Sequence, residues 1–402
     1  MNSNEIRSSF LEYFNSIGHK IIPSSSLIPH DDSLLFTAAG MVPLKDYFLG
    51  NKETSTPNMT SSQKCIRTID IDIIGDTDRH LSFFEMLGNF SVGKYFKKEA
   101  IEYSYHYITE ILNIDKDLLW FTVYKDDDEA YKIWKDIIGV SPDRIQRGDK
   151  DNFWHMNIPG PCGPCSEIFI DRGSKYGEPG GPIGGGEDRF IEIWNLVFME
   201  SIQEAPFEIV EELPKKNIDT GMGLERIAMI MQDKDNLFDT DLFKPLYDEL
   251  NKNIDNSNSK YEKIIIDHIK SSTFMISDGV VPTNEGRGYI LRRLIRRAIR
   301  AYNQINNTPS SLDYLIEIVV EIYKNSYPEL STNKNKIIKL FTKEEELFQK
   351  TLNKGIQEIT TLIENNNTVS AKDAFYLFET LGFPFELTKE ISSENNLSLI
   401  HI

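Results

Sequence analysis

The chain has 402 residues, of which 44 are Lys or Arg and 62 are Asp or Glu, so its formal net charge at pH 7 is −18. That length favours two domains, and the acidic balance excludes a general nucleic-acid coat protein, so any RNA contact has to be local. The three cysteines are too few, and odd in number, for a disulfide framework. Because the sequence has neither a signal pattern nor an apolar run near the ~20 residues of a membrane span, it predicts a cytoplasmic protein with no membrane partner.

The predicted elements change in kind along the chain. Apolar residues recur at helical spacing over residues 6–17 and Gly18 ends the segment, which predicts an amphipathic opening helix. The later patterns predict a short strand at 20–22, antiparallel strands at 63–68 and 79–89, a strand at 118–124, a helix over 126–138, a loop at 177–186 and a central strand at 190–199. Helical periodicities then dominate. We therefore expect an α+β domain at residues 1–235 and a mostly helical domain at residues 236–402.

Two glycines and an arginine stand at the entry to the helix-like run after residue 223, in the string DTGMGLER at residues 219–226. Gly221 and Gly223 allow the backbone to approach a flat ligand closely, and Arg226 is placed to stack on a base or reach a phosphate. The string alone is a weak signal, because a turn that leads into a core helix has the same pattern, with Arg226 on the surface.

A second motif combines cations with an aromatic ring on paired strands. Arg67 lies in QKCIRT at residues 63–68, and a polar loop leads to the returning strand. Period-two alternation predicts that Arg79, Leu81, Phe83 and Glu85 share one face of that strand. The alternative interpretation is that Arg67 and Arg79 form surface salt bridges.

These motifs together resemble the class II aminoacyl-tRNA synthetases. The strings FFEMLGNF at 83–90, GPCGPCSE at 160–167 and DTGMGLER at 219–226 resemble the alanyl-tRNA synthetases in particular, and the likeness extends over residues 6–384. It implies a class II antiparallel sheet flanked by helices, followed by a helical domain for the tRNA acceptor stem. It also implies an ATP-dependent ligase that converts alanine to alanyl-adenylate and transfers it to the 3′ end of tRNA(Ala).

The same resemblance implies the ATP site. Arg67 would bind the α-phosphate and the alanine carboxylate, and Arg79 and His80 the distal phosphates. Phe83 and Arg226 would cover the two faces of adenine beside Gly221 and Gly223, and Mg²⁺ would bridge the phosphates. Glu85, on the same predicted strand face as Arg79 and Phe83, would contact metal or adenine. Arg67 and Arg226 are thus the expected catalytic residues.

The amino-acid pocket is expected on the strand at 190–199. Asn195 is the single polar residue on an otherwise apolar face, and a buried amide needs hydrogen-bond partners. One interpretation is that it caps a neighbouring loop. The resemblance implies instead that Asn195 and Val197 line the alanine site, with Trp154 as its wall and Asp219 as the partner of the α-ammonium.

Cys162 and Cys165 have the spacing of zinc ribbons and thiol–disulfide enzymes. Because a structural zinc site needs four ligands and no second such pair exists, we expect a rigid turn at residues 160–166 that holds Trp154 and Glu167 at the pocket. The zinc site of the family lies in a later domain that this chain lacks.

The residues from 286 to 300 contain six arginines and no acid: Arg287, Arg292, Arg293, Arg296, Arg297 and Arg300. The last four lie along one helical stripe, which is the best candidate for RNA phosphates, although ion pairs with glutamates of the helical domain also fit. The resemblance adds Asn284 and Glu379 as readers of a G·U pair in the acceptor stem. Glu379 stands where the family pattern has Asp.

Two rival functions remain from the sequence. A catalytically inactive, synthetase-like RNA-binding or regulatory protein would have lost Arg67, Arg79 or Arg226, and a ligase that loads a carrier protein would not need the arginine stripe. The family has a separate editing domain, and nothing that resembles it appears before Ile402. We therefore expect a truncated chain that is monomeric as a fragment.

Overall fold

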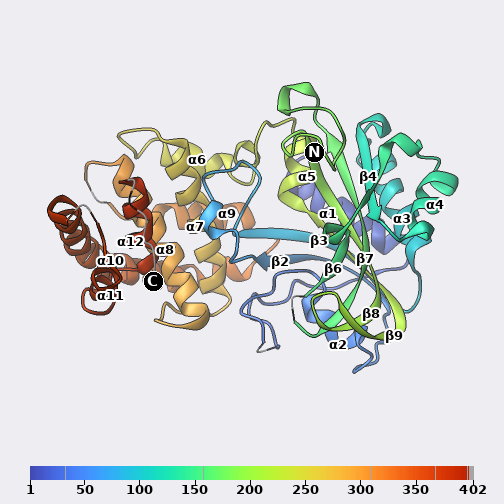
Figure 1. Cartoon of the computed structure of the whole chain (residues 1–402), viewed down its shortest axis with the longest axis horizontal. Helices are drawn as coiled ribbons and strands as arrows, with labels where there is room; N and C mark the ends of the chain where they lie inside the picture. Colours follow the sequence, from blue (N-terminus) through green and yellow to red (C-terminus); the bar gives the residue numbers. More distant parts are fainter. Residues whose placement is uncertain (32, 157, 309, 367, 396, 398–402) are drawn as a thin grey trace. The chain divides into compact units, whose positions relative to one another are not determined.

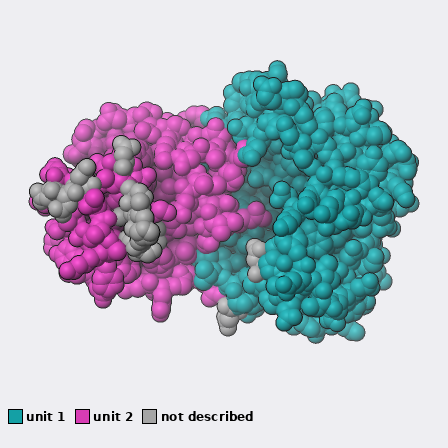
Figure 2. Space-filling view, viewed as in Figure 1, with its two compact units in different colours: residues 1–66, 84–241 teal, residues 67–83, 242–402 magenta. Residues whose placement is uncertain are grey.

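The computed structural model describes residues 1–31, 33–156, 158–308, 310–366, 368–395 and 397. It forms two compact units, coloured separately in Figure 2. The first contains residues 1–66 and 84–241, and the second contains residues 67–83 and 242–402. The units thus divide six residues after the boundary expected at 235, and the helical unit also includes the segment 67–83, which no sequence pattern indicated.

The described residues of the first unit contain most of a nine-stranded sheet (Figure 1). Its order is β1-β2-β3-β9-β8-β7-β4-β5, and β6 pairs with β7. The strands are β1 Lys20–Ile21, β2 Asn58–Ile66, β3 Phe83–Val92, β4 Leu119–Tyr124, β5 Ile145–Gly148, β6 Phe153–His155, β7 Gly160–Asp171, β8 Phe190–Ala205 and β9 Glu208–Gly223. The central pairs from β3 through β9, β8 and β7 to β4 are antiparallel, whereas β1–β2 and β4–β5 at the two edges are parallel.

Helices flank this sheet. They are α1 Ser3–Ser16, α2 Lys45–Phe48, α3 Lys97–His106, α4 Asp128–Lys132 and α5 Leu224–Met231, and α3 and α4 continue as π-helical turns to Ile111 and Ile138. The opening helix begins with a capping box in which Asn2 accepts the Glu5 backbone N–H at 2.9 Å and the Glu5 carboxylate accepts that of Asn2 at 2.9 Å. Ile6, Phe10 and Phe14 of its apolar stripe are fully buried, and α1 packs on β2 and α5. The predicted opening helix is confirmed.

The strand predictions were confirmed for β4 and β8 and were partly wrong for the paired strands. Strand β2 ends at Ile66 and β3 begins at Phe83, so Arg79 and Leu81 precede the strand and do not share its alternation. The predicted turn at residues 160–166 is also wrong, because this segment is the start of β7, with a bulge between Cys162 and Cys165. At Gly163 a Cβ would lie 2.0 Å from the carbonyl oxygen of Phe198, so the strands approach here as only glycine allows.

The second unit is helical. Its elements are α6 Lys244–Leu250, α7 Ser259–Ser277, α8 Gly286–Ile305, α9 Asp313–Tyr323, α10 Glu329–Asn366, α11 Ala371–Glu379 and α12 Phe385–Glu394. Asn258 is the N-terminal cap residue of helix α7. The helix is buried along nearly its whole length and packs against α8, α9 and α10. Across the described ranges, no helix combines the length and apolar character needed to cross a bilayer. Residues 398–402, where the sequence stops, lie outside the described part.

Candidate active site

The central strands gather the predicted alanine-site residues into neighbouring rows. Across β7, β8 and β9 one row runs Cys165–Val197–Asp219, and the next runs Glu167–Asn195–Gly221. Directly paired residues point to the same face of a sheet, and so do residues two apart on one strand. These side chains therefore share one face of the first unit.

Three oxygen atoms on this face are buried without a hydrogen-bond partner among the described residues, and one of them, Oδ1 of Asn217, lies one row beyond Asp219 on β9; the other two lie in the rows just described. These two are Oδ1 of Asn195 and Oδ1 of Asp219. The Asp219 side chain is almost completely buried, and this burial raises the pKa of its carboxyl to about 7. Leaving buried acceptors unpaired costs about 1–3 kcal/mol each, which a ligand that donates hydrogen bonds would recover. The pair is therefore set up to receive a donor, and an ionised Asp219 would favour a cation.

The wall beside these oxygens is apolar. Val197 and Cys165 belong to a buried cluster with Phe90 and Met199, and the half-buried Trp154 packs against that cluster. Trp154 is on β6, opposite Gly163 of β7. This arrangement brings Trp154 to the side of the sheet core that contains Val197.

Glu167 is a half-buried acid on the same face, which the sequence placed at the pocket. Its Oε2 atom accepts hydrogen bonds from Thr122 Oγ1 at 3.0 Å and from Asn152 Nδ2 at 3.2 Å. Burial, assisted by the negative charge of Glu192, raises the pKa of Glu167 to about 8. A carboxyl that is neutral at pH 7 in such a position is typical of functional sites.

The DTGMGLER string forms the end of β9 and the start of α5. Gly223 is the N-terminal cap residue, where a Cβ would make only ordinary contacts with Arg226, whereas at Gly221 a Cβ would lie 2.7 Å from Met86 Sδ. The Arg226 guanidinium Nη1 donates to the Glu192 carbonyl and to Glu192 Oε2, both at 3.0 Å. Glu192, which the sequence did not single out, thus holds Arg226 at the helix entrance.

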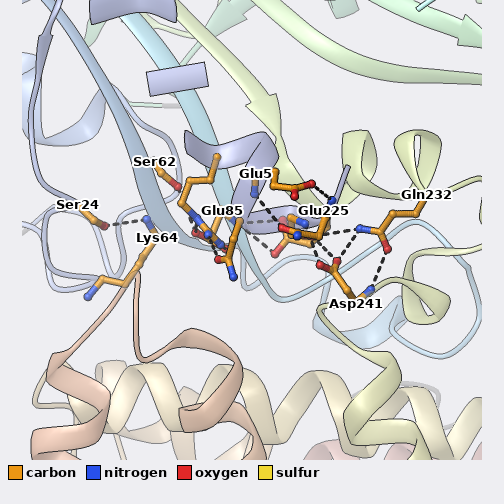
Figure 3. A network of polar contacts seen from close by, with 12 residues as sticks. Glu5, Ser24, Ser62, Lys64, Glu85, Glu225, Gln232 and Asp241 are labelled. Atoms are coloured by element: carbon orange, nitrogen blue, oxygen red, sulfur yellow. Dashed lines mark hydrogen bonds and ion pairs between the residues drawn. The ribbon is translucent and has the colours of Figure 1, made fainter. Parts of the chain in front are cut away.

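Glu85 is placed differently from the expected contact with metal or adenine. It is fully buried, and its carboxylate accepts two hydrogen bonds from Arg7 at 2.8 and 2.7 Å and one from Ser62 at 3.2 Å. Its backbone N–H donates to Glu225 Oε2 at 3.0 Å, within the polar network of Figure 3. The carboxylate therefore joins α1 to β2 and β3 and has no exposed surface for a ligand.

The segment 67–83 of the second unit carries the other predicted ATP residues. Arg67 is exposed, Arg79 and His80 are half-buried, and Thr77 Oγ1 lies 2.8 Å from His80 Nδ1. Phe83 is fully buried and stacks on Phe274 with ring centroids 4.1 Å apart and an interplanar angle of 17°. The ring thus has a protein partner on one face and no exposed surface for adenine.

The arginine stripe of α8 forms contacts within the second unit. Arg293 pairs with Asp72, and Arg297 donates to the backbone carbonyl of Ile71. The other two stripe members bind carboxylates: Arg296 pairs with Glu344 at 2.8 Å, and Arg300 pairs with Glu390 at 3.1 Å and Glu394 at 2.7 Å. The structural ion pairs that the sequence left as an alternative are therefore present.

Asn284 and Glu379 are both exposed, the first just before α8 and the second at the end of α11. Arg292 donates a hydrogen bond to Asn284. In the described part of the chain no hydrogen bond or ion pair joins Asn284 to Glu379, so their joint role stays a prediction.

Neither the cysteines nor the acids form an evident metal centre. All three thiols are buried, and burial raises the pKa of Cys162 to about 11 and that of Cys165 further. Among the residues with described positions, no group of three or more His, Cys, Asp or Glu side chains could hold a metal ion.

Comparison with known proteins decides the family. The family model described as tRNA synthetases class II (A) matches residues 5–401. This chain belongs to that family. It is 47% identical over 415 residues to an alanine-tRNA ligase of Fusobacterium nucleatum subsp. nucleatum, covering 100% of this chain and 48% of that protein. It is 46% identical over 413 residues to an alanine-tRNA ligase of Desulfitobacterium hafniense (strain Y51), covering 98% of this chain and 47% of that protein.

The chain spans about half the length of the curated relatives it matches. Among solved structures, it is similar at 11% identity to the apo histidyl-tRNA synthetase of S. aureus, with a TM-score of 0.35 over 58% of this chain and 69% of that one. The family membership therefore comes from the sequence match, and it agrees with the α+β fold and the helical second unit expected from the sequence.

Proposed function

We propose that this chain activates alanine with ATP and transfers the alanyl group to the 3′ end of tRNA(Ala). The observation that carries the proposal is the pair of buried, unpartnered oxygens of Asn195 and Asp219 beside an apolar wall. The support from relatives is their printed name, alanine-tRNA ligase, at 47% and 46% identity.

The alanine would be bound by its ammonium group. Ionised Asp219 supplies the countercharge, and Oδ1 of Asn195 accepts a second N–H of the ammonium. Val197 and Trp154 then enclose the methyl side chain. Because both acceptors are already fixed on a sheet, binding costs little reorganisation, which favours a well-defined orientation of the carboxylate.

The first reaction joins two anions. A carboxylate oxygen of alanine attacks the α-phosphorus of ATP, the bond to the bridging oxygen of the β-phosphate breaks, and pyrophosphate leaves with Mg²⁺. Arg67 would neutralise the α-phosphate and the carboxylate, and Arg79 and His80 the distal phosphates, since such transfers depend on positioning and charge stabilisation. Mg²⁺ enters with ATP as part of the substrate, and Glu85 is not proposed as its ligand because Arg7 already binds that carboxylate.

The adenine would lie beside Gly223 and Arg226. We propose Phe84 in place of Phe83 as its aromatic partner, since Phe84 is half-buried and shares a strand face with Met86, whose sulfur atom approaches Gly221. Arg226 would cover the other face of the base while Glu192 holds the guanidinium. In the second reaction a terminal ribose hydroxyl of tRNA attacks the alanyl carbonyl and AMP leaves, with Asn284 and Glu379 proposed as acceptor-stem contacts.

Alanine-dependent exchange of labelled pyrophosphate into ATP tests activation, and charging of tRNA(Ala) tests transfer. We expect both, with no exchange when alanine is omitted. A chain that binds tRNA(Ala) but shows no exchange would be the inactive RNA-binding protein. Exchange without any charging of the tRNA would favour the carrier-protein ligase.

A further inference from the structure

The segment 67–83 is fixed by helices of its own unit at both of its ends. Near its start, Arg297 of α8 donates to the Ile71 carbonyl and, at 3.4 Å, to the Asp72 carbonyl. At its end, the Ser82 backbone N–H donates to Asp267 Oδ1 of α7 at 2.9 Å, and the Ser82 hydroxyl donates to Asp267 Oδ2 at 2.5 Å. The carbonyl of Ser82 in turn accepts the backbone N–H of Arg67 at 3.0 Å.

His268 joins these two attachments into one chain of hydrogen bonds. Its Nε2 atom lies 3.1 Å from Arg297 Nη1, and its Nδ1 atom lies 2.8 Å from Asp267 Oδ2. Arginine can only donate, so Nε2 accepts and Nδ1 carries the hydrogen given to Asp267. Complete burial lowers the pKa of His268, which agrees with a neutral ring in this tautomer. The chain therefore runs from Arg297 through His268, Asp267 and Ser82 to the backbone of Arg67.

Salt bridges on the outer side of the segment support the same attachment. Arg293 of α8 pairs with Asp72, Lys260 of α7 pairs with Asp76 at 2.7 Å, and Lys263 pairs with Asp78. In each of these pairs the carboxylate is exposed to solvent, so each pair contributes little individually. The buried chain is different, because each of its polar groups would lose a partner in a medium where unpaired groups are costly.

We propose that Arg297, His268 and Asp267 are positioning residues for ATP activation, which hold the segment carrying Arg67, Arg79 and His80 in its binding conformation. This inference rests on the proposed function of that segment in binding the phosphates. It assigns Arg293 and Arg297 to the segment and not to RNA phosphates. The two assignments differ in one measurable respect: a residue that positions the ATP segment affects activation in the absence of RNA.

The test is alanine-dependent ATP–pyrophosphate exchange without tRNA, measured against ATP concentration for Arg297→Ala and Arg297→Lys. Misplacing a reacting group by about 1 Å costs up to ~10²-fold in rate, so we expect kcat/KM for ATP to fall about 10- to 10²-fold in Arg297→Ala. Lysine retains the charge and one donor, so Arg297→Lys should recover part of the loss. Unchanged exchange with reduced tRNA charging would overturn the proposal and make Arg297 an RNA contact.

Glu345→Ala provides the matched control. Glu345 of α10 is also a buried carboxylate that accepts a backbone N–H, from Leu312 at 3.0 Å, and a serine hydroxyl, from Ser311 at 2.6 Å. Among the contacts of the described residues, Glu345 has none of this kind with segment 67–83. We expect Glu345→Ala to lower the thermal unfolding midpoint about as much as Asp267→Ala while keeping kcat/KM for ATP; equal losses of kcat/KM would overturn the proposal.

Two further measurements keep the proposal testable if a variant fails. Ser82→Ala removes only the hydroxyl of the segment and should raise the KM for ATP even if Arg297→Ala does not fold. If the unmodified chain shows no exchange, the proposed function fails, and amide hydrogen exchange then tests the inference alone. Faster exchange at residues 67–82 in Arg297→Ala than in Glu345→Ala supports it, and equal rates contradict it.

Discussion

The sheet face of the first unit and the segment 67–83 of the second unit differ in whether their polar groups have hydrogen-bond partners. On the sheet, Asn195 and Asp219 each keep a buried oxygen without a partner among the described residues. In the second unit, Asp267 and Arg297 bind backbone groups of the segment and are joined through His268. On the sheet face the unpartnered oxygens lie beside an apolar wall and support a place for substrate, whereas the satisfied network in the second unit fixes the position of the segment.

The largest effect is expected where a satisfied network in the first unit is broken. Arg7→Ala leaves the Glu85 carboxylate buried without its ion-pair partner, so the free energy of unfolding should fall by about 3–5 kcal/mol. The exposed pair between Lys175 and Asp235 is the control, and Lys175→Ala should leave the free energy of unfolding nearly unchanged. Urea unfolding of both variants measures the difference. If Arg7→Ala lost no more unfolding free energy than Lys175→Ala, the buried ion pair would contribute no more to stability than the exposed one.

The next effect concerns the unpartnered oxygens. Asp219→Asn keeps the shape of the side chain and removes the negative charge that would bind the α-ammonium of alanine. The activation free energy for alanine should therefore rise by about 2–5 kcal/mol, which is measured as a fall in kcat/KM for alanine in the exchange reaction. The unfolding midpoint should not fall, because the native carboxyl already carries the cost of burial. Near-normal kcat/KM for alanine in a folded Asp219→Asn chain would remove the proposed ammonium site.

A smaller effect is expected from the apolar wall. A hydrophobic pocket rejects an added hydroxyl by only ~10²-fold and a missing methylene by ~1–3 kcal/mol, so serine and glycine should both support slow exchange. This chain should also form Ser-tRNA over a long time course with labelled serine. Seryl product that forms and then decays without an added factor would show that the chain itself edits.

The last effect, about tenfold for the first pH unit below 7, is a pH dependence. With its pKa raised to about 7, Asp219 binds the ammonium fully only above that pH, so kcat/KM for alanine should rise by about tenfold per pH unit below 7 and then level off. Asp219→Asn should lose this limb, whereas Glu167→Gln, which removes the neighbouring group with a pKa of about 8, should keep it. A pH limb that persists in Asp219→Asn would assign it to another group.

The raised pKa of Asp219 also makes the free energy of unfolding depend on pH. The folded pKa of Asp219 is raised above an unfolded value of about 4, so the folded state holds a proton that the unfolded state has released between about pH 4 and pH 7. The stability linked to this group is complete below about pH 4 and is lost as the pH rises through 7. Unfolding free energies of the unmodified chain and Asp219→Asn should therefore diverge over that window.

The sequence predicted the strand that carries Asn195 because period-two alternation is a local pattern, whereas β9, which carries Asp219 and Gly221, was not predicted. Asn195, Val197, Asp219 and Gly221 lie in adjacent rows because β8 and β9 pair in one register, which no single strand pattern indicates. The GPCGPCSE string was misread as a turn, since its glycines and prolines are typical of turns. The structure shows that Gly163 serves close strand packing at a bulge.

The segment 67–83 could not be placed from sequence because its contacts are distant along the chain. Ser82 and Asp267 are 185 residues apart, and Arg297 and Ile71 are 226 residues apart. The stacking of Phe83 on Phe274 was not predicted for the same reason, because the two residues are far apart in the sequence. The arginine stripe was recognised as a pattern, yet only its neighbours in space distinguish a surface for RNA from a set of structural contacts.

The most direct test of the central claim is the binding of a non-hydrolysable alanyl-adenylate analogue, measured by calorimetry on the unmodified chain and on Asp219→Asn. The account predicts tight binding to the unmodified chain, a loss of about 2–5 kcal/mol in Asp219→Asn, and weaker binding of the matching seryl analogue. Equal binding of the alanyl analogue to both proteins, or no binding to either, would contradict the claim that this chain makes alanyl-adenylate at the sheet face that carries Asn195 and Asp219.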